Sequence, residues 1–131
     1  MLKSGDIKVF NKIVLPEDIA AFPDQLVHEV YATFALARDV EWSSRLFLIE
    51  IIEEDEEGIG IELQVKHISP ALVGEKVAIE ATITSFIENK LYCDITAKVG
   101  NRIIATGKTG QKIIKKDKFK KILSGLTTEN K

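Results

Sequence analysis

Three polar residues in this 131-residue sequence have side chains suited to acid–base and nucleophilic chemistry: Thr33, Glu41 and His67. An imidazole has an unperturbed pKa near neutrality, so His67 is the natural candidate for a general base. A hydroxyl such as that of Thr33 attacks an electrophile only when a base activates it. Glu41 could hold an imidazolium, orient a water molecule or attack an electrophile itself. The three residue types therefore match the needs of a hydrolytic reaction.

Each of these residues also has an ordinary structural interpretation. A histidine on an apolar strand face is often only a core residue, a threonine can cap the first turn of a helix, and Glu41 can be an exposed helical glutamate. Their spacing adds a constraint, because eight helical residues rise about 12 Å. Thr33 and Glu41 therefore cannot touch within one straight helix. Either Thr33 precedes the helix proper, or the site combines two subunits.

The segment that carries Thr33 and Glu41 is expected to be a long helix. Residues 30–52 contain no glycine or proline, and residues 30–37 are apolar on nearly every face, which is typical of a buried helix. Residues 46–52 fit a helix or a strand equally well by pattern. The acidic residues 53–57 and Gly58 are expected to form a solvated turn.

After this turn the hydrophobic period changes to two, which predicts strands. Alternation runs through residues 59–67, 77–88, 91–99 and 102–114, and an earlier strand is expected over residues 7–15, before a helical turn at 16–18. One apolar face per strand is typical of an antiparallel sheet covered on one side. His67 has the parity of Leu63, so it should face the helix. The fold class is therefore α+β, a curved antiparallel sheet wrapped around a central helix, with a short amphipathic helix over residues 115–123.

Composition excludes several function classes. Lys and Arg total 18 against 20 Asp and Glu, so the net charge of −2 argues against nucleic acid as the main partner. No apolar run reaches the roughly 18 residues of a membrane span, and no signal-peptide pattern is present, which predicts a cytoplasmic protein. The single cysteine, Cys93, excludes an internal disulfide or a multi-cysteine metal site. Abundant Lys, Glu and Ile are typical of a thermophile.

The spacing of the polar residues has a counterpart in a known family. Residues 29–33 read Glu-Val-Tyr-Ala-Thr, Glu41-Trp42 follows eight residues after Thr33, Gly60 begins a predicted strand, and Val65-Lys66-His67 lies near its end. This arrangement resembles the fluoroacetyl-CoA thioesterase-like family of hotdog-fold thioesterases. That family has Glu-Val-Phe-Ala-Thr, then Glu-Trp, a strand-opening glycine and Val-x-His. The resemblance extends over residues 29–120.

The resemblance implies a single hotdog domain over residues 1–131 that hydrolyses a short or medium acyl-CoA thioester. The family's catalytic Thr, Glu and His correspond to Thr33, Glu41 and His67, and its oxyanion-side glycine corresponds to Gly60. Hotdog proteins usually pair into dimers with sites at the interface, which implies a homodimer or a higher homo-oligomer. No metal or redox cofactor is implied, since coenzyme A enters as part of the substrate.

Other features bear on selectivity. Residues 15–28 are shorter than the family's lid segment and do not match it, so selectivity for fluoroacetyl does not carry over. Lysines cluster toward the C-terminus and suit the phosphates of coenzyme A, although a solvated face is the favoured explanation of the cluster. Cys93 has the parity of a small core residue. His28 precedes the helix with no specified role.

Two alternatives remain. A hotdog dehydratase or hydratase is disfavoured, because Ala21 stands where the His-Phe-Pro motif of dehydratases has its catalytic histidine, and because Glu62 and His67 have opposite strand parity. A non-catalytic module that binds acyl-CoA as a sensor needs the pocket but not the three polar residues. Turnover separates the sensor from the enzyme.

Overall fold

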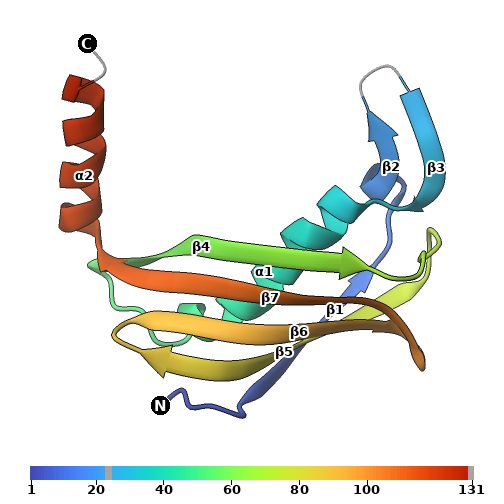
Figure 1. Cartoon of the computed structure of the whole chain (residues 1–131), viewed down its shortest axis with the longest axis horizontal. Coiled ribbons are helices and arrows are strands. Elements are labelled where there is room, and N and C mark those ends of the chain that lie inside the picture. The colour runs from blue at the N-terminus through green and yellow to red at the C-terminus, as the bar shows by residue number, and fades with distance from the viewer. Residues whose placement is uncertain (23–24, 130–131) are drawn as a thin grey trace.

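The computed structural model describes residues 1–22 and 25–129, and its main element is a five-stranded antiparallel sheet (Figure 1). The strand order is β1-β5-β6-β7-β4, so β1 and β4 form the two edges. The strands are β1 (Ile7–Ile13), β4 (Glu56–His67), β5 (Lys76–Ile87), β6 (Lys90–Val99) and β7 (Arg102–Lys115). All four strands predicted from the two-residue period are therefore present, as is the N-terminal strand.

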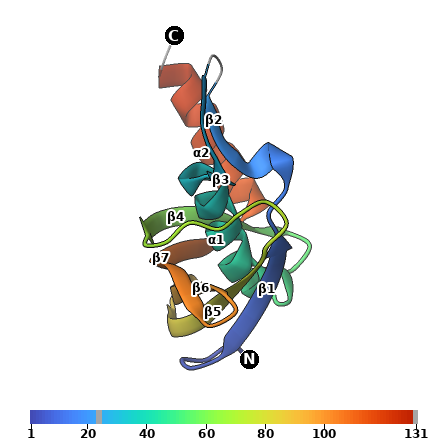
Figure 2. The same cartoon turned by 90° about the vertical axis from the view of Figure 1, so that its right-hand side faces the viewer.

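The helix α1 (Thr33–Ile49) lies in the concave face of the sheet, whose strands curve around it (Figure 2). The helix expected over residues 30–52 is thus present but shorter at both ends. Val30 and Tyr31 belong instead to a strand, and Tyr31 donates its backbone N–H to the carbonyl of Ala71 at 2.8 Å. Apolar character alone marks a buried segment, so it could not separate this strand from the helix that follows.

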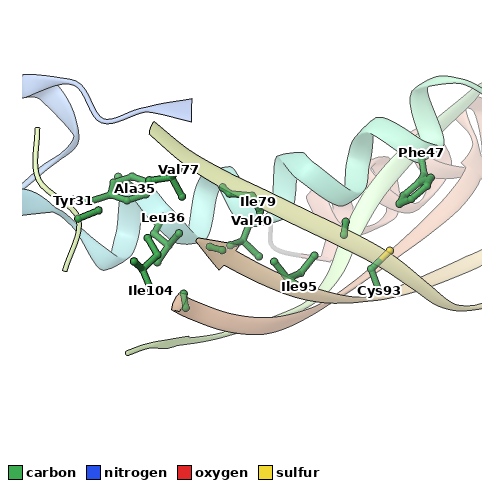
Figure 3. Close-up of a cluster of buried hydrophobic side chains, with 14 of the residues drawn as sticks. Tyr31, Ala35, Leu36, Val40, Phe47, Val77, Ile79, Cys93, Ile95 and Ile104 are labelled. Carbon is green, nitrogen blue, oxygen red and sulfur yellow. The ribbon is translucent and has the colours of Figure 1, made fainter. Parts of the chain in front are cut away.

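The core joins one face of α1 to the inner face of the sheet (Figure 3). Leu36 and Val40 of the helix pack with Ile79 and Ile95, and all four side chains are buried. Cys93 belongs to this core, as its parity predicted. Burial raises the pKa of its thiol to about 11, so Cys93 is a protonated core residue at neutral pH.

Strand β4 contains a bulge that the sequence pattern did not indicate. The β4–β7 register shifts between Gly60 and Glu62. Before the bulge Gly60 faces α1, and after it Leu63 lies opposite the buried Thr109 of β7. The residues of β4 that face the helix therefore have even numbers before the bulge and odd numbers after it. The expectation that residues 59–67 share one alternating face is therefore wrong at Ile59. The bulge allows both Gly60 and His67 to face inward.

Residues 15–28, which do not match the family's lid segment, form most of a hairpin. A 3-10 turn (Pro16–Asp18) is followed by β2 (Ile19–Phe22) and β3 (Gln25–Tyr31), which pair with an irregular register. The turn begins with proline, as predicted. Phe22-Pro23-Asp24 is expected to interrupt the helical structure after this turn, and two of its residues, 23 and 24, lie outside the described part of the structure.

A buried carboxylate anchors the base of this hairpin. Asp18 accepts hydrogen bonds from the Leu15 amide at 2.9 Å and from Arg38 Nη2 at 3.0 Å, and it pairs with Lys12 Nζ at 3.1 Å. Arg38 also binds Asp39, which accepts a hydrogen bond from the Tyr31 hydroxyl. Burial alone would raise the pKa of Asp18, but its hydrogen bonds outweigh burial and hold the pKa below its ordinary value.

We expect Asp18→Asn to lower the free energy of unfolding at pH 7 by about 1.5–3 kcal/mol, the range for a hydrogen bond to a charged group. A carboxyl group whose pKa is lower in the folded state than in the unfolded state stabilises the fold at pH values above its unfolded-state pKa. This stabilisation is lost as the pH falls through its folded-state pKa. The difference between wild type and variant should therefore shrink below about pH 4. Urea unfolding across pH measures this. The exposed Asp94→Asn is the matched control, and an equal loss there would contradict the assignment.

The C-terminal helix α2 (Lys116–Glu129) is longer than the helix expected over residues 115–123. It projects from the end of β7 past the β4 edge of the sheet (Figure 1). The acidic turn is correspondingly shorter than expected, because Glu56, Glu57 and Gly58 already belong to β4. Among the described helices, none combines the length and hydropathy needed to cross a bilayer.

Candidate active site

The structure brings Thr33 and His67 into direct contact. Thr33 is the first residue of α1 and His67 is the last of β4, and Thr33 Oγ1 lies 2.9 Å from His67 Nδ1. The alternative in which Thr33 caps the helix is wrong, because Ala32 occupies the N-cap position without a side-chain hydrogen bond. The alternative in which Thr33 precedes the helix is also wrong. The hydroxyl is directed across to the imidazole instead.

The two ring nitrogens of His67 differ in their contacts. His67 Nε2 is shielded from solvent and has no hydrogen-bond partner among the described residues. Thr33 and His67 line an open depression whose other walls are Ile68, Ser69 and Pro70, at the start of the loop after β4. A hydroxyl bound to one imidazole nitrogen, with the second nitrogen unpaired, is suited to proton transfer to a bound reactant.

Glu41 and Gly60 form a second pair. A Cβ atom at Gly60 would lie 3.3 Å from the Glu41 carboxyl carbon and in steric conflict with Oε1, so the carboxylate occupies the space that the missing side chain leaves. The backbone of α1 at this level is held from β7, because Gln111 Nε2 donates to the Glu41 carbonyl at 3.1 Å and to Ser44 Oγ at 2.9 Å. Glycine at position 60 is thus what lets this carboxylate lie against the strand.

The sequence analysis did not identify Gln111, although its position in the alternation of β7 indicates that its side chain faces the core. It lies two residues before buried Ile113 and opposite Gly60 in β7, and its side chain is 1% exposed. A buried amide on the inward face of a strand needs hydrogen-bond partners, and the amide nitrogen of Gln111 finds them on α1. Gln111 therefore fixes the position of the Glu41 backbone relative to the sheet.

The two pairs are separated within one chain. Thr33 and Glu41 both lie in α1, so the predicted helical rise of about 12 Å between them applies. Gly60 and His67 are seven residues apart on β4, which is about 20 Å of strand after allowing for the bulge. The structure therefore brings Thr33 to His67 and Glu41 to Gly60, but it does not bring all four residues together in a single subunit.

Comparison with known proteins identifies the family and the fold of this chain. The model of the fluoroacetyl-CoA-specific thioesterase family matches residues 14–117. No curated protein matches at a significant level. A hypothetical protein of Thermus thermophilus, described as a thioesterase superfamily member, superposes with a TM-score of 0.89 at 30% identity, covering 96% of this chain and 93% of the other.

Two further solved structures share the fold at lower identity. The fluoroacetyl-CoA thioesterase itself gives a TM-score of 0.87 at 21% identity over 95% of this chain and 97% of that one. A hotdog-like protein of Thermanaerovibrio acidaminovorans gives 0.84 at 19% identity over 93% and 90%. The expected hotdog fold is confirmed. With the family model spanning most of the sequence, the chain belongs to the fluoroacetyl-CoA-specific thioesterase family.

Proposed function

We propose that this protein hydrolyses a short or medium acyl-CoA thioester to the free acid and coenzyme A. The observation that carries the proposal is the contact between Thr33 Oγ1 and His67 Nδ1 at the rim of an open depression, with His67 Nε2 unpaired. Membership of a thioesterase family supports the reaction class. Selectivity for fluoroacetyl is not part of the proposal, because residues 15–28 depart from the family's lid.

His67 is the proposed base, and its contact with Thr33 is compatible with two reaction routes. When His67 Nδ1 accepts the hydroxyl proton, Thr33 attacks the thioester carbonyl, the C–S bond breaks, and water later releases the acid from Thr33. When water attacks directly, the Thr33 hydroxyl takes a proton from that water as it passes its own proton to Nδ1, so the shielded Nε2 does not have to meet the reactant. In both cases the proton finally reaches the departing thiolate. An acyl adduct on Thr33, detected by mass spectrometry during turnover, distinguishes the two.

Glu41 and Gly60 are proposed to act on the thioester bound at the Thr33–His67 pair of the other subunit in a homodimer. Within one chain these pairs lie about 20 Å apart along β4, too far to share one reacting carbonyl. Glu41 would stabilise the imidazolium or orient water, and the Gly60 backbone amide would donate to the oxyanion. No resident metal or redox cofactor takes part, since coenzyme A arrives with the substrate.

The β4 edge supports pairing of two chains. This 12-residue strand has β7 on one side only, and its Ile61 and Leu63 side chains are exposed. A long apolar edge strand is an aggregation hazard unless another chain covers it. Antiparallel pairing of two β4 strands would cover it and bring the end of each strand toward the start of the other. We expect a cytoplasmic homodimer.

Release of free thiol from a series of acyl-CoA thioesters of increasing chain length tests the proposal. We expect turnover with a clear optimum among short or medium acyl groups. Tight binding of an acyl-CoA by calorimetry without thiol release would overturn it in favour of the sensor interpretation. A hydratase would add water to an enoyl-CoA and release no thiol.

A further inference from the structure

The C-terminal helix α2 carries an apolar face that its own chain leaves uncovered. Ile122, Leu123 and Leu126 are 46–50% exposed and follow the spacing of one helical face together with half-buried Phe119. Lysines flank this face at positions 116, 118, 120 and 121. Exposed apolar stripes of this kind on a described helix mark a binding surface.

The base of α2 is fixed at the start of β4. Lys115 pairs with Glu56 across the β4–β7 ladder, and the Lys116 amide donates to the Asp55 carbonyl at 2.8 Å. Lys115 Nζ also pairs with Asp55 at 3.0 Å. From this anchor the helix extends beyond the β4 edge, into the space beside that edge where no part of its own sheet lies (Figure 1).

The opposite end of β4 carries a complementary surface. Ile68 and Leu72 are each 56% exposed in the loop of residues 68–73, which also forms the walls of the Thr33–His67 depression. Next to this loop, Glu29 lines a groove with Leu72 and Val73. The charge of this surface differs between its two sides, because Arg102 donates to Ser69 and Pro70 on one side and pairs with Glu75, whereas Glu29 lies on the other side beside Leu72 and Val73. The basic margin of α2 is complementary in charge to the Glu29 side.

We propose that α2 docks on the 68–73 loop of a second copy of this chain and forms a wall of that copy's active site. The inference rests on the proposed pairing through β4. When two β4 strands pair antiparallel about a twofold axis, the start of one lies beside the end of the other. Glu56, and with it the base of α2, is thereby brought next to the partner's His67 and Ile68.

Within one chain the same contact is impossible. Ile68 follows the last residue of β4, while α2 begins at the strand's other end, about 36 Å away at 3.3 Å per residue. A covalent link between these two regions is therefore necessarily a link between subunits. This separation makes cross-linking a decisive test.

The experiment uses the full-length double variant Ile68→Cys/Ile122→Cys, and in parallel Leu72→Cys/Ile122→Cys, treated with a short bifunctional maleimide. Native Cys93 stays, because it is buried in the core. We expect a covalent dimer on a denaturing gel in at least one double variant, several-fold above the matched control in which Lys121→Cys replaces Ile122→Cys. Lys121 adjoins Ile122 but points to the other side of the helix.

Light scattering on the same samples separates the possible failures. A dimer that does not link through position 122, or links equally through position 121, overturns the docking of α2 while leaving the subunit pairing intact. A monomer overturns both. Binding of the unlinked protein to vesicles of anionic phospholipid would assign the basic apolar helix to a membrane surface instead.

Discussion

We expect His67→Ala to lower kcat/KM for acyl-CoA hydrolysis by about 100-fold, equivalent to about 2.7 kcal/mol of transition-state stabilisation. Among the described residues, the Thr33 hydroxyl is hydrogen-bonded to the imidazole of His67 through Nδ1, and both residues line the open depression. Its removal takes away both the base and the acid for thiolate departure. Thiol release under subsaturating substrate measures the loss.

The sequence has one other histidine, which provides the control. His28 is exposed on β3, and we expect His28→Ala to retain activity close to that of wild type. Circular dichroism and thermal unfolding should be unchanged for both variants, since His67 is only half-buried at the end of an edge strand. If His67→Ala kept activity within threefold of wild type, the proposed base would be wrong.

The second large effect is expected from the smallest substitution, Gly60→Ala. The added methyl group meets the Glu41 carboxylate and no backbone atom, so the fold can accommodate it only by moving that carboxylate away from the strand. We expect kcat to fall to the level of Glu41→Ala, about 100-fold below wild type, which is typical for loss of one catalytic contact. Substrate binding at the Thr33–His67 end should change much less.

A double-variant cycle tests this origin. If Gly60→Ala acts by displacing the Glu41 carboxylate, then it should cost little further activity in a Glu41→Ala background. Additive losses would show that Gly60 acts by another route, such as its backbone amide. Gly125→Ala serves as the control, because a Cβ atom at Gly125 meets nothing within 4 Å.

Much of the fold could be predicted from side-chain periodicity. The strands β5 and β6 are paired on both sides and covered on one face by α1, so burial alternates over most of their length. The alternation of Val77, Ile79 and Ala81 gives the correct inward face. The turn at Pro16 was also predictable, because proline fixes the backbone angle of a first helical position. Cys93 followed from the same parity.

The wrong predictions fall where the alternation of apolar and polar residues does not determine the structure. The β4 bulge adds one residue opposite β7 and determines that Gly60 faces Glu41. A glycine within a strand often marks a bulge, but the apolar alternation of Ile59, Ile61 and Leu63 continues across it and gives the opposite indication. The strand that ends at Tyr31 is as apolar as the helix that begins at Thr33, so the boundary depends on tertiary hydrogen bonds to the Ala71 and Asp18 carbonyls. Local pattern carries no signal for such long-range partners.

The candidate site was predictable as a set of residues but not as an assembly. The helical rise between Thr33 and Glu41 already required either a helix that begins after Thr33 or a second subunit. The structure removes the first option, because Thr33 starts α1, and it adds the length of β4 between Gly60 and His67. Which option applies depends on where the helix begins, and that is set by the packing of Tyr31 and Ala32.

Mixing two inactive variants tests the shared site most directly. In a heterodimer of His67→Ala and Glu41→Ala subunits, one site carries both defects and the other carries neither. After unfolding and refolding an equal mixture, half of the dimers are heterodimers with one intact site of two, so we predict about a quarter of wild-type thiol release. If each site were complete within one chain, every chain would carry one defect. The mixture would then remain as inactive as its parents, which would contradict the two-subunit site.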